Sequence, residues 1–353
     1  MKKTSSINLF EKYLTIWVLL CMLIGVLIGQ YLGFIPDFLA RFTYAEISIP
    51  IAILIWLMIF PMMLKVDFTS LKNIKNNPKG LYLTWVVNWL IKPFTMFFIA
   101  GFFLLFIFSN LIEDSLARQY LAGAVILGAA PCTAMVFVWS HLTKGNPAYT
   151  VVQVATNNII LLFAFTPIVA ILIRFTGVLD TIGMVLPLNT LILSVVLFVV
   201  VPLTAGMIVR QNVIKRRGEA YFNGGFLPKF KHVTIVGLLL TLVLIFAFQS
   251  QVIIDNPLHI VLISVPLIIQ TFVIFFIAYF AARKLRLSYD VAAPAGMIGA
   301  SNFFELAVAV AIALFGAQSP VALATTVGII VEVPVMLALV SIANRTKHWF
   351  KFV

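Results

Sequence analysis

The chain has 353 residues, of which 62% are hydrophobic and 10% are charged. Soluble globular domains carry about 25% charged residues, so this composition excludes that class. The net charge of +12 does not indicate nucleic-acid binding, because the basic residues fall in alternate connections between apolar segments. That placement is a topology signal of membrane proteins.

Runs of 18 or more nearly uncharged apolar residues recur along the chain and predict membrane-spanning helices. Residues 1–12 are polar, and the apolar segment from Leu14 is too long for a cleaved signal peptide. We expect ten spans, at residues 14–34, 46–64, 81–107, 117–141, 149–174, 187–209, 232–254, 257–281, 291–316 and 319–342.

The basic residues predict the orientation of these spans. If the N-terminus is cytoplasmic, the connections on that side carry 20 of the 24 Lys and Arg residues, and the opposite side carries three. Both termini are therefore expected in the cytoplasm. The longest connection, residues 210–231, is expected to be a basic linker near anionic headgroups.

The fourth span is interrupted. Gly128 and Pro131 fall halfway along it, and Cys132 follows directly. Proline removes a backbone donor and glycine has low helix propensity. The freed backbone groups are tolerated at membrane depth only where protein or a water-filled cavity covers them. A thiol is therefore expected at a protein-covered break.

The ninth span has a matching interruption at Gly299-Ala-Ser-Asn-Phe-Phe-Glu305. In each half a glycine follows 17 residues later, then a proline, then a last span with its own internal proline: Gly145, Pro147 and Pro167, against Gly316, Pro320 and Pro334. Five spans per half require the second half to be inverted. We predict an all-α membrane protein with two inverted five-helix repeats, residues 1–180 and 181–353, whose fourth and ninth helices are interrupted and cross.

Glu305 is the first candidate for chemistry. A charged carboxylate at mid-membrane costs about 2.5–3.5 kcal/mol, so an acid there is suited to exchanging protons. A neutral structural carboxyl is the less favoured alternative. Asn302, one helical turn earlier on the same face, is a plausible polar partner.

Cys132 is the second candidate. A buried cysteine usually packs as a small hydrophobe, and Cys21, in an uninterrupted span, is read that way. Cys132 differs because a position at the start of a half-helix stabilises thiolate, which is a soft ligand for a soft metal or metalloid.

Other polar residues within the spans have less decisive interpretations. Glu332 is a second intramembrane acid, either a site or relay residue or a group that satisfies backbone freed by Pro334. Lys92 either pairs with an acid or extends to the interface. Asn157 is expected to hydrogen-bond between helices. Trp139 either walls a cavity or marks the membrane interface.

Several site classes are absent. The four histidines lie near span ends or in connections, which argues against a histidine metal site. No Walker motif or HExxH motif occurs, so neither a built-in ATPase nor a zinc protease is expected. An intramembrane serine enzyme would require a base that we cannot assign. No cofactor is expected.

With these residues and Ile59-Phe-Pro-Met-Met-Leu-Lys65, the chain resembles the arsenite permeases of arsenical resistance, in the bile/arsenite/riboflavin transporter superfamily. The likeness extends from about Leu14 to Ser341. It implies a fold with panel and core domains in the cytoplasmic membrane. It also implies export of trivalent arsenic, and in some members antimony, coupled to proton entry. The family's essential cysteine and glutamate match Cys132 and Glu305.

The resemblance also implies roles for further residues. The family's tryptophan and asparagine positions fall on Trp139 and Asn157, and a tenth-span glutamate on Glu332. The expected substrate-binding set is therefore Cys132 as the arsenic thiolate ligand, with Glu305, Asn302, Trp139 and Asn157, and the proton-coupling residues are Glu305 and Glu332. The main alternative is a sodium-coupled organic-anion symporter of the same fold, which sodium-stimulated transport would indicate.

Overall fold

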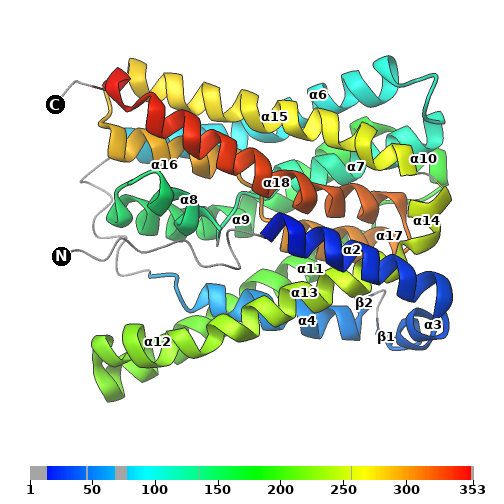
Figure 1. Cartoon of the computed structure of the whole chain (residues 1–353), viewed down its shortest axis with the longest axis horizontal. Helices are drawn as coiled ribbons and strands as arrows, with labels where there is room; N and C mark the ends of the chain where they lie inside the picture. Colours follow the sequence, from blue (N-terminus) through cyan, green and yellow to red (C-terminus); the bar gives the residue numbers. More distant parts are fainter. Residues whose placement is uncertain (1–13, 45–46, 68–77, 134, 256, 351–353) are drawn as a thin grey trace.

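Long apolar helices dominate the structure, as their composition predicts. The computed structural model describes residues 14–44, 47–67, 78–133, 135–255 and 257–350 (Figure 1). Five helical stretches there are long and apolar enough to cross a membrane, by length and composition: Pro78–Ile107, Pro147–Thr176, Leu188–Lys229, Pro257–Lys284 and Pro320–Arg345. Shorter apolar helices accompany them. The architecture is that of a polytopic membrane protein.

The first half contains α2 (Leu14–Tyr31), α3 (Phe34–Ala40), β1 (Thr43–Tyr44), β2 (Ile47–Ser48), α4 (Ile49–Met63), α5 (Pro78–Val86), α6 (Lys92–Gly101), α7 (Asp114–Ala129), α8 (Val136–Leu142) and α9 (Pro147–Thr176). The two short strands form an antiparallel pair that the sequence did not predict. Helices α5 and α6 are joined by a π-helical turn, Val87–Ile91, and a second π-helical turn, Phe102–Ile107, follows α6.

The second half contains α10 (Val178–Ile182), α11 (Leu188–Val195), α12 (Val201–Tyr221), α13 (Phe230–Phe248), α14 (Ser250–Asp255), α15 (Pro257–Lys284), α16 (Tyr289–Ala300), α17 (Phe304–Phe315) and α18 (Pro320–Arg345). A π-helical turn, Val196–Val200, joins α11 to α12. Each of the ten predicted segments overlaps one or more of these helices, which shows that the segments are helical where the structure describes them.

One expectation about the connections was wrong. Residues 210–231 were expected to form a linker, but α12 continues to Tyr221, and helical turns Phe222–Phe226 and Leu227–Lys229 lead into α13. Gln, Lys and Arg are good helix formers, and they continue the helix beyond the apolar stretch. The kink falls at Gly218, whose φ of 82° is a conformation open to glycine.

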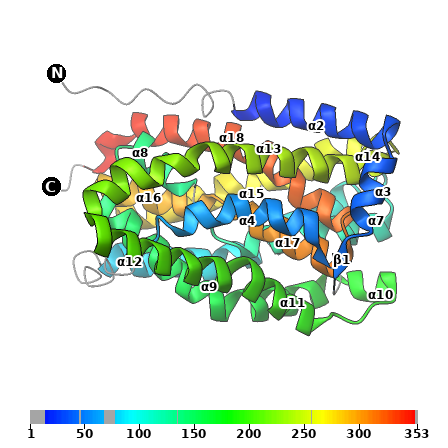
Figure 2. The ribbon, with the colours of Figure 1, turned by 90° about the horizontal axis from the view of Figure 1, so that it is seen from below.

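The helices pack in two groups. In the first, α13 contacts α2 and α4, and α12 also contacts α4. In the second, α18 contacts α7, α15 and α17, while α6 and α9 also pack on α7. Figure 2 shows α13 and α4 running along the molecule together. Helix α17 contacts α4 as well as α18, so the second half of the interrupted helix lies between the groups.

Candidate functional site

Two interrupted helices meet inside the second group. Helix α7 ends at Ala129, α16 ends at Ala300, and each is followed by a residue in an extended conformation. Pro131 and Asn302 then form an antiparallel β-bridge between the two breaks. The breaks therefore fall where the glycine and proline pattern predicted them.

Backbone hydrogen bonds hold the two breaks together. The Phe303 amide donates to the Ala130 carbonyl at 2.8 Å, and the Cys132 amide donates to the Ser301 carbonyl at 3.4 Å. Polar backbone groups that a helix break exposes need partners in a membrane interior. Each break therefore supplies partners for the other.

Cys132 lies in this crossing with 1% of its surface exposed. Its predicted position at the start of a half-helix was wrong, because α8 begins only at Val136. Cys132 therefore precedes the helix instead of starting it, and the expected stabilisation of a thiolate by the start of a half-helix does not apply. Neither cysteine is in a disulfide.

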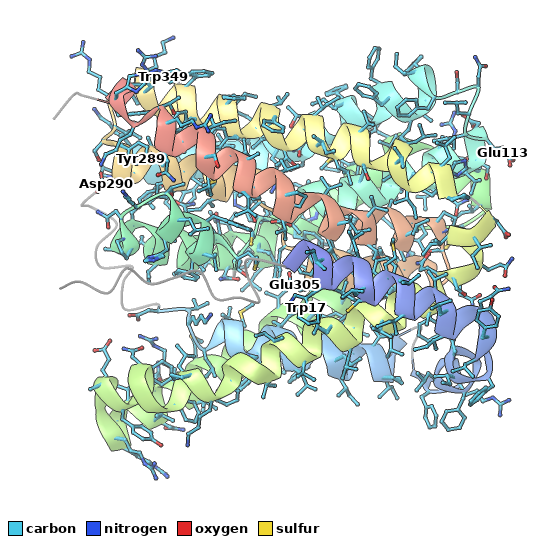
Figure 3. All side chains as sticks on the ribbon, viewed as in Figure 1. Trp17, Glu113, Tyr289, Asp290, Glu305 and Trp349 are labelled. Carbon is cyan, nitrogen blue, oxygen red and sulfur yellow. The ribbon has the colours of Figure 1, made fainter. Side chains whose placement is uncertain are left out.

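Glu305 lies in the first turn of α17 and is 3% exposed. Figure 3 shows it near the middle of the molecule, between the two groups of helices. It lines a small cavity together with Ile55 of α4 and Thr241 and Leu242 of α13. The cavity has about 10 Å³ of room, close to the minimum needed for one water molecule. This acid therefore faces the first group of helices.

Asn302 was expected on the same helical face as Glu305, and that expectation was wrong. The helix begins only at Phe304, so Asn302 belongs to the extended break. Its backbone amide donates to Glu332 Oε1 at 3.2 Å. Within the described residues, its side-chain Oδ1 is buried without a hydrogen-bond partner.

Glu332 of α18 binds the second break. Its Oε1 accepts hydrogen bonds from the Ser301 hydroxyl and from the Asn302 amide. The sequence had linked this acid to backbone groups freed by Pro334. The helix in fact continues through Pro334 to Arg345, and the groups that Glu332 satisfies belong to the break in the ninth span. Glu332 and Glu305 are close enough for their charges to interact.

Lys92 also binds the second break. It is fully buried, so it does not extend to the interface, and its Nζ donates to the Ser301 carbonyl at 2.5 Å. Its charge interacts with Glu332 and with Cys132. Burial rules out the alternative in which Lys92 extends to the interface, and its hydrogen bond is to a backbone carbonyl rather than to an acid. Ser301 had no role in the sequence reasoning, although a hydroxyl beside a predicted break was a usable signal.

Asn157 belongs to a neighbouring polar cluster. Its Oδ1 accepts hydrogen bonds from Trp89 Nε1 at 3.4 Å and Gln153 Nε2 at 3.2 Å. Trp89 lies in the π-helical turn that leads to Lys92. The prediction that Asn157 hydrogen-bonds between helices is confirmed. Asn88, whose two buried amide atoms have no partner among the described residues, was missed by the sequence analysis.

Trp139 lies on α8 and is 2% exposed. Its indole Nε1 has no hydrogen-bond partner in the described part of the chain. Its burial shows that Trp139 lies in the protein interior and does not mark the membrane interface. The same part of the chain holds no cluster of three or more His, Cys, Asp and Glu side chains suited to a metal ion.

Comparison with known proteins identifies related transporters. The model of the sodium bile acid symporter family matches residues 52–256. The chain is 63% identical to the arsenical-resistance protein Acr3 of Alkaliphilus metalliredigens, over 98% of this chain and 95% of that protein. It is 32% identical to Acr3 of Corynebacterium glutamicum, over 96% and 90% of the two chains. An uncharacterized transporter of Synechocystis is 45% identical, over 99% and 92%.

Proposed function

The chain belongs to the sodium bile acid symporter family and, within it, to the arsenical-resistance proteins, and on that premise we propose that it exports arsenite in exchange for protons. It is a multi-pass membrane protein, and relatives are named as transporters rather than enzymes. The observation that carries the proposal is the bridge between Pro131 and Asn302, which joins the break containing Cys132 to the break before Glu305.

The proposed binding step uses one sulfur. Arsenite at neutral pH is mostly the uncharged trihydroxide, and the Cys132 thiol displaces one hydroxyl to form a sulfur–arsenic bond. The thiol proton leaves with that hydroxyl as water. A soft ligand selects arsenic, whereas three thiolates would hold it too tightly for release. Hydrogen bonds from Glu305, Asn302, Trp139 and Asn157 complete the proposed substrate-binding set, and antimonite is a further candidate substrate.

The proposed transport step is alternating access. An uncharged substrate is not driven by the membrane potential, so proton entry through Glu305 and Glu332 supplies the driving force. Helices α2, α4, α12 and α13 rock against the group that contains the crossing. Glu305 supports this role because it lines the cavity against α4 and α13. No ATPase partner is required.

We further propose ten spans arranged as two inverted repeats, residues 1–180 and 181–353, in the cytoplasmic membrane with both termini inside. The C-terminal ends of α12, α15 and α18 lie at the same end of the molecule (Figure 1), and all three carry Lys or Arg in their last turns or last half. Clustering of basic residues on one side supports this orientation. The N-terminal residues on which it also depends lie outside the described residues.

Substitution of Cys132 by serine tests the ligand role. We expect Cys132→Ser to abolish arsenite resistance and raise arsenite accumulation in arsenic-sensitive cells, while the protein still reaches the membrane. Cys21→Ser is the matched control, since Cys21 is buried in α2, and it should keep wild-type resistance. Wild-type resistance of the Cys132→Ser cells would contradict the proposal.

Substitution of Glu305 by glutamine tests the coupling. In everted membrane vesicles with an imposed pH gradient, wild-type protein should accumulate arsenite and Glu305→Gln should not. Glu113→Gln is the control, because Glu113 is exposed at one end of the molecule (Figure 3). Gradient-driven uptake by Glu305→Gln would refute the assignment. Uptake that requires sodium instead would indicate the organic-anion symporter class.

A further inference from the structure

Lys92 is a buried cation at membrane depth. Lysine is rarely fully buried without a partner, yet Lys92 is 0% exposed. The π-helical turn Val87–Ile91 ends directly before it. Such turns insert an extra residue into a helix and are frequent at functional sites. The local backbone is therefore shaped to present this side chain to the protein interior.

The surroundings of the ammonium group are those of a cation site. Lys92 Nζ donates to the carbonyl of Ser301, the extended residue that directly follows the last residue of α16, Ala300. The C-terminal end of a helix carries partial negative charge. On the other side, the charge of Glu332 interacts with Lys92, and Glu332 itself is hydrogen-bonded to Ser301 and Asn302. One carbonyl thus binds the ammonium group, and one carboxylate, held by the same Ser301, lies close enough to act on its charge.

Transporters with interrupted helices use the same groups to hold sodium. Unwound carbonyls and the C-terminal ends of half-helices coordinate the coupling ion in those proteins. The family matched here is named for sodium symport. Two more buried oxygens, Glu332 Oε2 and Asn302 Oδ1, have no hydrogen-bond partner within the described residues. The second break therefore has the oxygen chemistry of a sodium site, with an ammonium group in it.

We propose that the Lys92 ammonium occupies the position of a coupling sodium ion at Ser301 and Glu332, so that the second break is held closed by a tethered cation and transport needs no sodium. The transport experiment below rests on the proposed arsenite export, whereas the melting experiment does not. Its structural consequence is that removal of the side chain creates a vacant site for a monovalent cation.

The test compares two variants that both lose the charge. Lys92→Ala leaves a space lined by oxygens, whereas Lys92→Met fills that space with an apolar side chain of similar length. Purified Lys92→Ala should melt at a higher temperature in sodium chloride than in choline chloride, by roughly 2–4 °C. Lys92→Met and the wild type should show no such difference. Lys92→Ser serves the same purpose as the alanine variant if the latter fails to fold.

Transport by the wild type completes the test. Wild-type vesicles should accumulate arsenite equally in sodium and choline buffers. A sodium requirement in the wild type, an equal sodium shift in Lys92→Met, or no sodium shift in either small variant would overturn the inference. Absence of arsenite uptake under every condition would instead refute the proposed export, while the melting comparison would still decide whether Lys92 stands in for the ion.

Discussion

Each of the two breaks interrupts one helix, but the polar groups of the two breaks have different hydrogen-bond partners. The first lies between the end of α7 at Ala129 and the start of α8 at Val136, and the second between Ala300 and Phe304, so more residues separate the helices at the first. At the second, Lys92 and Glu332 from two other helices bind Ser301 and Asn302. At the first, the Thr133 hydroxyl is buried without a hydrogen-bond partner within the described residues. Trp139 Nε1, on α8, is likewise buried and lacks a hydrogen-bond partner there.

Within the part of the chain that the structure describes, both breaks keep unpaired buried polar atoms, which at the second are Asn302 Oδ1 and Glu332 Oε2, but at the second break side chains from two other helices also hold the backbone. Hydrogen bonds from neighbouring elements make a buried break rigid, whereas unpaired buried groups cost free energy. Unpaired groups beside Cys132 are available to a polar solute such as arsenic trihydroxide. We infer that the second break is the framework of the crossing and that the first break, with Cys132, is the side that receives substrate.

The largest effect is expected at Glu332. Glu332→Leu removes the acceptor of two hydrogen bonds and leaves the Lys92 charge without its acid. Each lost hydrogen bond to a charged group costs roughly 1.5–3 kcal/mol, so the variant should melt far below the wild type in detergent and lose transport. Glu332→Gln keeps an acceptor and should melt closer to the wild type. Equal melting of Glu332→Leu and the wild type would contradict the framework role.

A smaller effect separates the two breaks directly. Ser301→Ala loses the hydroxyl that donates to Glu332 and should destabilise the protein by about 1.5–3 kcal/mol, the range for hydrogen bonds to charged groups. Thr133→Val at the first break removes an unpaired buried hydroxyl and loses no hydrogen bond in the described structure, so its melting temperature should not fall below that of the wild type. Its arsenite affinity should fall. The reverse order of melting temperatures would contradict the comparison.

The sequence predicted the positions of both breaks because their cause is local. Gly128 and Pro131 act on their own helix, and the first break falls beside them, while the second break follows Gly299. The geometry of the residues inside the breaks was not predictable in the same way. Asn302 was placed on a helical face, but pairing with Pro131 holds it extended, and that pairing joins residues 171 positions apart.

The partners of the intramembrane charges also depend on tertiary structure. Sequence spacing identified Lys92 and Glu332 as unusual, because ionisable groups in spans are rare. It did not show that both converge on Ser301, since three separate elements supply these residues. The helical extension of α12 was missed for another reason. Its basic residues were read as a topology signal, and their helix propensity was not considered.

The smallest expected effects concern the glycines that follow the two interrupted helices, because their equivalence in sequence hides different physical causes. Gly316 has a φ of 90° in open space, so Gly316→Ala costs backbone strain, about 1–3 kcal/mol. Gly145 has no such φ, but a Cβ there would lie 2.1 Å from Pro294 Cγ on α16. Gly145→Ala should therefore be destabilising by about 1–3 kcal/mol through overpacking. Because Ser140 Oγ would lie 2.8 Å from the same Cβ, adding Pro294→Ala should raise the melting temperature of Gly145→Ala only in part, and it should leave Gly316→Ala unrescued. Rescue of both variants would show that the two glycines act through one cause, and rescue of neither would show that contact with Pro294 is not what destabilises Gly145→Ala.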